Sequence, residues 1–474
     1  MTSVAPFPVA PFPSARRPGK RLTALITAVA LLAASGPAPA QPPAKGPPII
    51  RDAEIEQLLR EYTQPLLQAA GLGKQNIQVV IINDRAFNAF VADGRRIFIN
   101  AGTLMDANTP NEVIGVLAHE TGHIAGGHLS RLREEVGKAT TQSIVALLLG
   151  AGALVAASRS GSTNMGQAGM AALQAPQAMI QNQLLAYVRT QEDAADRAGV
   201  KFLTATGQSA KGMHDSFKRL ADQILYQTRY IDPYMQSHPL PAERVRALQE
   251  LARSNPYWDK QDSPSLQQRH DLMRAKLRGF IERPDSVLRL YQANDANLPA
   301  RYARAIASYR FANSAGALAQ IDALIQANPQ NPYFHELKGQ ALLEGGKPAE
   351  AVAPLRRAVQ LAPNPALIQI MLAQALIASN ARGEEAVTLL ETALRREPES
   401  PEAYAQLAMA YGRKGDLAHA DLSSAQAAFM RGELLTARQL AARAKTRFPV
   451  GSPGWVKADD ISSYRPPGQS GGRN

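Results

Sequence analysis

The stretch Thr109-Pro110-Asn111-Glu112-Val113-Ile114-Gly115-Val116-Leu117-Ala118-His119-Glu120-Thr121-Gly122-His123 decides the fold of the N-terminal half. Its first residues predict the start of a helix, because Thr109 suits the N-cap, Pro110 suits the first helical position, and Glu112 completes a capping box. The aliphatic residues that follow recur at helical spacing. We therefore expect one helix with an apolar stripe and a polar C-terminal end.

Two histidines lie on one face of this helix. His119 and His123 are four residues apart, so their side chains project one turn above the other, with Glu120 beside them. The pattern His-Glu-x-x-His offers two imidazoles to a zinc ion and places a carboxylate next to the water that the ion activates. The alternative is a pair of solvated histidines on an ordinary helix. Histidine is rare, with eight in 474 residues, and this favours the zinc site.

Composition narrows the classes of protein that fit. A length of 474 residues predicts two or three domains. Cysteine is absent, which excludes disulfide frameworks and thiolate metal sites, so a metal ion has to be held by histidine and carboxylate. The formal net charge is +12, and part of it lies between Arg16 and Arg21. No recognition motif for nucleic acid accompanies the rest, so we interpret that charge as solvated helix faces.

Residues 1–40 predict a secretory signal peptide. A basic stretch ends at Arg21, an apolar run too short to span a bilayer comfortably follows, and Ala38-Pro39-Ala40 offers small residues to a signal peptidase. We expect cleavage before Gln41 and delivery to the periplasm. The alternative is an uncleaved N-terminal anchor. No cysteine follows, so a lipoprotein is excluded.

A small sheet is predicted ahead of the metal helix. After a Pro-rich linker over 41–48 and a helical pattern over 53–70, three segments are typical of strands: 77–82, 87–92 and 95–100. If the last strand lies at the edge of the sheet, an extended peptide can pair with it. The alternative is a strand buried inside the sheet.

The segment after the metal helix is low in complexity. Residues 143–157 are mostly apolar but fall short of the roughly 20 residues that a transmembrane helix needs. We expect residues 143–183 to form a hydrophobic lid over the cleft, with peripheral membrane contact at most, and a true membrane span is the alternative. Closer to the motif, His128 follows a glycine pair, and we expect it in a supporting or surface role rather than as a ligand.

Residues 184–204 predict a second amphipathic helix. Glu192 and Asp196 fall one turn apart on its otherwise apolar face, where burying an acid is costly unless it binds something. The plain interpretation is a pair of surface acids. Beside the His-Glu-x-x-His motif, however, Glu192 is a candidate third zinc ligand, and Asp196 is a candidate for orienting a ligand imidazole.

The C-terminal half contains a repeat. Pro329, Pro363 and Pro398 fall 34 and 35 residues apart in alanine-rich helical sequence. Small residues recur at matching positions, among them Ala317, Ala351 and Ala386, then Ala358 and Ala393. This period is the tetratricopeptide signature. We predict a solenoid over 263–460, an architecture that usually presents a concave face to a partner, and a flexible tail over 461–474.

These residues resemble a known family, the zinc metallopeptidases that include HtpX and the CAAX prenyl proteases. The match covers residues 77–246 through the stretches 119–123 and 191–196 and through Ser237-His238-Pro239. The order of signal, peptidase and solenoid, together with the closing stretches 451–455 and 459–461, resembles more closely the BepA branch of that family.

The resemblance implies both the fold and the site. The implied fold is an α+β zincin-type peptidase domain over 41–262, mainly helical with a small sheet, followed by an all-α tetratricopeptide solenoid. The implied zinc ligands, for one Zn²⁺ per chain, are His119, His123 and Glu192, with Glu120 as general base and Asp196 in support. His238 falls on a histidine that in this branch can act as a fourth ligand and keep the enzyme latent. We also consider His238 as the catalytic donor to the oxyanion.

Three functions are consistent with this sequence. The resemblance favours a periplasmic zinc endopeptidase that cleaves misassembled or stalled outer-membrane proteins. Its solenoid would recruit clients or assembly machinery, which the resemblance implies are the Bam complex and the LptD assembly pathway. The second function is that of a chaperone or scaffold in which proteolysis is occasional. The third is an integral membrane protease, which requires residues 143–157 to span the bilayer.

Overall fold

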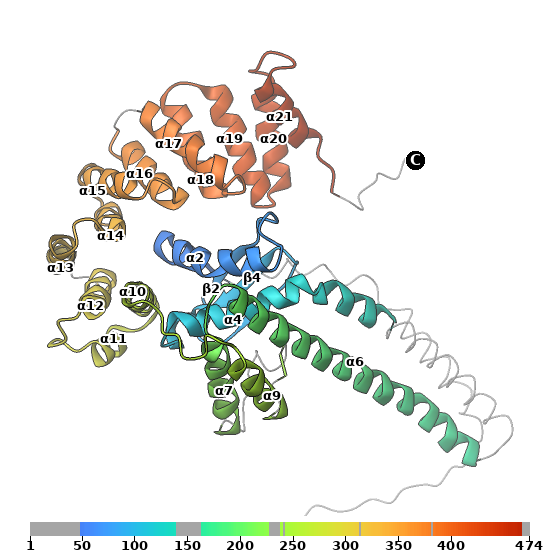
Figure 1. Ribbon diagram of the computed structural model, residues 1–474. Helices are drawn as coiled ribbons and strands as arrows, with labels where there is room; N and C mark the ends of the chain where they lie inside the picture. Colours follow the sequence, from blue (N-terminus) through green and yellow to red (C-terminus); the bar gives the residue numbers. More distant parts are fainter. Residues whose placement is uncertain are drawn as a thin grey trace, which may run out of the picture. The chain divides into compact units, whose positions relative to one another are not determined.

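A small mixed sheet lies in the N-terminal part of the chain (Figure 1). The computed structural model describes residues 48–138, 163–226, 238–239, 242–311, 314–380 and 383–466. The strands are β1 (Ile49–Ile50), β2 (Gln78–Ile82), β3 (Ala89–Val91) and β4 (Arg96–Asn100), in the order β1-β2-β4-β3. β2 and β4 run parallel, and both outer pairs are antiparallel.

The position of β4 decides between two expectations. β4, the strand predicted ahead of the metal helix, lies between β2 and β3, so it is inside the sheet rather than at its edge. The four residues from Ile97 to Asn100 are all buried, so both faces of β4 are covered, as expected of a strand inside a sheet. Within the described residues, β3 occupies the edge on this side of the sheet.

Helices of the N-terminal part share a hydrophobic core with this sheet. They are α2 (Ala53–Ala69), α3 (Ala101–Asp106), α4 (Pro110–Ala125), α6 (Thr163–Ala205), α7 (Lys211–Tyr226) and α9 (Ala242–Arg253). Aliphatic and aromatic side chains from several elements form one core, including Leu58 of α2, Ile97 of β4, Leu117 of α4 and Phe217 of α7. The N-terminal part is therefore mainly helical with a small sheet, as the sequence predicts.

The rest of the described chain is a series of packed helices (Figure 1). They are α10 (Pro264–Ile281), α11 (Pro284–Leu290), α12 (Leu298–Arg310), α13 (Ser314–Ala327), α14 (Pro332–Glu344), α15 (Pro348–Leu361), α16 (Ala366–Ala378), α17 (Gly383–Arg396), α18 (Pro401–Arg413), α19 (Leu417–Met430), α20 (Leu434–Lys445) and α21 (Pro453–Ser463). The recurring small residues are all fully buried: Ala317, Ala351, Ala358, Ala386 and Ala393. The predicted solenoid of helix pairs is confirmed.

One helix is longer than its sequence pattern suggests. The prediction began the second amphipathic helix at residue 184, whereas α6 begins at Thr163. Its first part is rich in Gly, Ala, Gln and Met, which gives no regular apolar period by which a helix is recognised. The remainder of the predicted lid, 143–162, and the predicted signal peptide lie outside the described residues. At the other end, α21 continues to Ser463, past residue 460.

Among the helices that the structure describes between residues 48 and 466, none is both long enough and apolar enough to cross a bilayer. The apolar run 143–157 is not among them.

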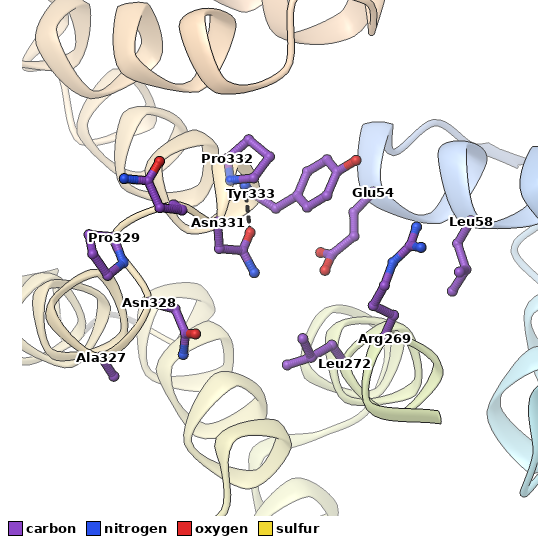
Figure 2. A pocket seen from close by; sticks show the side chains of 11 residues that line it. Glu54, Leu58, Arg269, Leu272, Ala327, Asn328, Pro329, Asn331, Pro332 and Tyr333 are labelled. Atoms are coloured by element: carbon purple, nitrogen blue, oxygen red, sulfur yellow. Dashed lines mark hydrogen bonds between the residues drawn. The ribbon is translucent and has the colours of Figure 1, made fainter. Parts of the chain in front are cut away.

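A buried charge cluster joins α2 to the solenoid. Lys276 of α10 lies 2.7 Å from Asp52, 3.2 Å from Glu54 and 3.8 Å from Glu336 of α14. Tyr302 of α12 donates a hydrogen bond of 2.9 Å to Glu54. A cavity of about 420 Å³ adjoins this cluster, where α2 and α10 meet the turn between α13 and α14. Figure 2 shows the side chains of Glu54 and Asn331 pointing into it.

Candidate metal centre

Helix α4 starts as predicted, with one difference. Thr109 Oγ1 accepts the backbone N–H of Glu112 at 3.3 Å, and Pro110 lies in the first turn. The Glu112 carboxylate accepts the N–H of Asn108 at 3.0 Å and pairs with Arg219. The predicted capping box is therefore wrong in one respect. The Glu112 carboxylate accepts the N–H of Asn108, the residue before the N-cap, instead of the N–H of Thr109, and Arg219 also contacts it.

Two glycines let α6 approach α4 closely. A Cβ on Gly122 of α4 would lie 2.8 Å from the carbonyl oxygen of Ala195. A Cβ on Gly199 of α6 would lie 3.2 Å from the backbone nitrogen of His119. The first distance is shorter than a real Cβ contact, so glycine is required at position 122. This approach brings Glu192 of α6 to the histidines of α4.

Four side chains from distant parts of the sequence meet here. One potential ligand atom from each of His119, His123, Glu192 and His238 lies within 4.8 Å of the others. His119 Nε2 is 3.1 Å from His123 Nε2, and His123 Nε2 is 3.3 Å from Glu192. His238 Nδ1 is 3.0 Å from the same carboxylate. Imidazole nitrogens and a carboxylate are the donors that a divalent metal such as zinc takes in proteins, so the residues fit a metal ion.

Glu120 lies beside this cluster and is completely buried. Neither of its carboxylate oxygens has a hydrogen-bond partner among the described residues. Oε1 lies 3.7 Å from His238 Nε2. A buried carboxylate without a hydrogen bond is costly, so Glu120 requires a partner that the described residues do not supply.

Asp196 and Arg244 surround the cluster on its outer side. Asp196 Oδ1 lies 2.9 Å from Nδ1 of His119, the nitrogen that faces away from the other ligand atoms. Arg244 donates to both oxygens of Asp196, lies 2.7 Å from Glu192, and donates to the carbonyl of Pro239 at 3.0 Å. Arg244 therefore connects the acids of α6 to the loop that carries His238.

Charges within this group set the protonation of its members. Burial opposes the charge of His119, but hydrogen bonds and charges from Asp196 and Glu192 outweigh burial and raise its pKa to about 9. Burial also opposes ionisation of Asp196, yet Arg244 holds the pKa of that carboxyl below its usual range. The pKa of Glu192 is lowered as well, because His238 and the two histidines of α4 outweigh burial. Both acids are therefore ionised at neutral pH and attract a cation.

The structure brings together every site residue that the sequence singled out. His119, His123, Glu192 and His238 lie in the cluster, and Glu120 and Asp196 contact it. His128 lies outside it, and burial, together with the charge of His123, lowers the pKa of His128 to about 4. Arg244 is a further residue of the site, to which no sequence motif assigned a role. The sequence feature that could have indicated it is the pair of acids on α6, since buried carboxylates require a cation.

The cavity of Figure 2 is separate from this centre, because none of the four clustered side chains lines it.

The family models that match this chain agree with the geometry of the centre. Residues 51–252 match the model of peptidase family M48, and residues 302–365 and 342–407 match tetratricopeptide repeat models. This chain carries an M48 peptidase domain followed by tetratricopeptide repeats. It is a metallopeptidase, and the M48 domain contains all of α4 and α6.

Curated relatives match most or part of this chain. The beta-barrel assembly-enhancing protease of Yersinia pestis is 25% identical over 422 residues, which cover 85% of this chain and 82% of that protein. The protein of the same name from Escherichia coli K12 is 25% identical and covers 72% of this chain and 69% of its own length. A Vibrio cholerae relative, whose name gives that assignment provisionally, is 33% identical over 44% of this chain and 41% of its own length.

Proposed function

We propose that this chain is a zinc-dependent endopeptidase. The observation that carries the proposal is a completely buried Glu120 without a hydrogen-bond partner among the described residues, next to four ligand atoms within 4.8 Å of one another. His119, His123 and Glu192 would hold the ion. Their nitrogen and oxygen donors suit zinc, and two of them lie one helical turn apart on a rigid helix.

The residues of the M48 domain divide the work of hydrolysis. When bound, zinc lowers the pKa of a water molecule to about 7 and polarises the peptide carbonyl. Glu120 accepts a proton from the attacking water and delivers it to the leaving amine. Asp196, 2.9 Å from His119 Nδ1, keeps the proton of His119 on that nitrogen and leaves Nε2 available for the ion.

His238 has two successive roles in this proposal. A zinc ion with four protein ligands has no position left for water, so His238 in the cluster corresponds to a latent enzyme. Cleavage requires His238 to leave the ligand group. His238 Nε2 lies 3.7 Å from Glu120 Oε1 in the cluster, so a short movement off the ion would leave its ring N–H near the base, where it could donate to the oxyanion that forms on the substrate.

The substrate would be an extended segment of another protein. β3 lies at the edge of the described sheet, packed beside α4, and an added strand there would run past the catalytic residues. Two relatives are named for beta-barrel assembly, so we propose that the clients are misassembled or stalled outer-membrane proteins in the periplasm. The solenoid would recruit them or their assembly machinery, the Bam complex and the LptD assembly pathway.

Casein cleavage by the purified chain beginning at Gln41 tests the enzymatic part, with zinc content measured on the same sample. We expect about one zinc per chain, and we expect Glu120→Gln to keep the zinc and lose cleavage, because an amide cannot accept the proton. Substantial cleavage by Glu120→Gln would refute the assigned base. A chain that binds no zinc would refute the metal centre.

Cells carrying only Glu120→Gln separate this function from the chaperone alternative. If proteolysis is the main function, the variant should fail to restore outer-membrane protein assembly, and it should accumulate uncleaved clients. Full restoration by the inactive variant would instead identify the solenoid as the functional part.

A further inference from the structure

A buried histidine contacts the far side of His123. His128 Nδ1 lies 3.0 Å from Nδ1 of His123, whereas Nε2 of His123 faces the other ligand atoms. The two rings meet edge to face at a centroid distance of 5.0 Å, and His128 is 6% exposed. His128 therefore contacts the ring nitrogen that would not bind the metal.

The backbone after α4 is built to make this contact. Gly126 ends α4, and Gly127 has a φ of 62°, a left-handed conformation that glycine adopts without strain. A Cβ on Gly126 would lie 2.1 Å from Nε2 of His128. The glycine pair thus turns the chain back and leaves room for the imidazole against the end of the helix.

The other histidine of α4, His119, has a comparable partner at its Nδ1 atom. A neutral imidazole that binds a metal through Nε2 carries its proton on Nδ1, and this N–H needs an acceptor to hold the ring in place. Asp196 occupies that position for His119 at 2.9 Å. His123 has no carboxylate at Nδ1 among the described contacts, and His128 occupies the equivalent position.

We propose that His128 is the positioning residue of His123, accepting its Nδ1–H and fixing the tautomer and ring orientation that bind zinc. The inference rests on the proposed zinc function. The two ligand imidazoles then differ in their support, since a carboxylate polarises His119 more strongly than a neutral imidazole polarises His123. His128 itself is not a ligand, because its contact is with the nitrogen that points away from the cluster.

Zinc affinity of the purified chain from Gln41, measured by competition with a chromophoric chelator, tests the proposal. We expect His128→Ala to weaken zinc binding about 10- to 100-fold, the usual effect of removing such a partner. His128→Asn places an amide oxygen near the position of Nδ1 and should restore most of the affinity. His214→Ala is the matched control, because His214 is also buried, at 5% exposure, but lies outside the cluster.

Each outcome either supports or overturns the positioning role of His128. Weakened binding in His128→Ala with recovery in His128→Asn, at melting temperatures like that of His214→Ala, supports the positioning role. Unchanged affinity in His128→Ala, or equal losses in the alanine and asparagine variants, overturns it. Failure of the proposed function is distinguishable, since the unaltered chain would then bind no zinc at all.

Discussion

Arg244 donates hydrogen bonds of 2.7 and 2.8 Å to the two oxygens of Asp196, and the two side chains are 9% and 4% exposed. Such a buried bidentate pair is costly to break, because removal of one partner leaves the other charge without compensation. Arg244→Gln should therefore destabilise the protein by about 3–5 kcal/mol. It should also weaken zinc binding, since Glu192 and the His238 loop both contact Arg244.

Arg244→Lys is the control that separates the effect of the positive charge from that of the hydrogen-bond geometry. Lysine keeps the positive charge but cannot donate to both oxygens of Asp196 and to Pro239 at once. We expect thermal melting to place it between the unaltered chain and Arg244→Gln. A glutamine variant that melts like the unaltered chain would contradict the assigned importance of this pair.

A methyl group at Gly122 should separate α4 from α6. The added Cβ would meet backbone atoms of Ala195 at 2.8 and 3.0 Å, and backbone cannot move aside as a flexible side chain does. We expect Gly122→Ala to lower stability by roughly 1–3 kcal/mol and to reduce zinc content, because Glu192 moves away with α6. Gly412→Ala is the control: that helical glycine has open space around it, so the change should be neutral or slightly stabilising. Equal zinc content in the two variants would contradict this account.

Local patterns identified the centre because its chemistry is concentrated in short motifs. His119, Glu120 and His123 share one helical turn, and Glu192 with Asp196 repeats that spacing on α6. The pairing of β4 inside the sheet could not be read from its sequence, since an interior strand and an edge strand with one covered face look alike. Arg244 was missed because it acts across tertiary structure, on Asp196, which lies 48 residues away in the chain.

In the solenoid, too, the sequence predicted the local repeat but not the contacts between distant residues. Its alanines were predicted by period and are buried as expected, but nothing in a repeat pattern indicates that Lys276 of α10 reaches Asp52 and Glu54 at the start of the M48 domain. The contact joins residues more than 200 positions apart, and only the folded chain reveals it. The same holds for the extra turns of α6, whose composition lacks an apolar period.

Removal of His238 should activate the enzyme. His238 Nδ1 lies 3.0 Å from Glu192, within the ligand group, so His238→Ala opens the fourth position on the ion. We expect faster basal cleavage of casein at unchanged zinc stoichiometry, because His119, His123 and Glu192 are still present. A fall in cleavage with zinc retained would instead mean that the oxyanion role of His238 outweighs its role as a plug. Glu120→Gln combined with His238→Ala should be inactive, which excludes a contaminating protease.

Glu336 should make stability depend on pH. Burial, together with the charges of Asp52 and Glu54, raises the pKa of Glu336 to about 8 in spite of Lys276. Between pH 4.5 and about 8, the folded state therefore holds a proton on Glu336 that the unfolded chain has released. The free energy of unfolding consequently falls as the pH rises through this range. Glu336→Gln removes this titration. Because each pKa unit corresponds to about 1.4 kcal/mol, the variant should melt measurably higher than the unaltered chain at pH 8 and similarly at pH 5. Glu384→Gln, whose side chain is 87% exposed, should follow the unaltered chain at both values. If Glu336→Gln lowers the melting temperature at pH 8, the ionised carboxylate is instead a stabilising partner of Lys276.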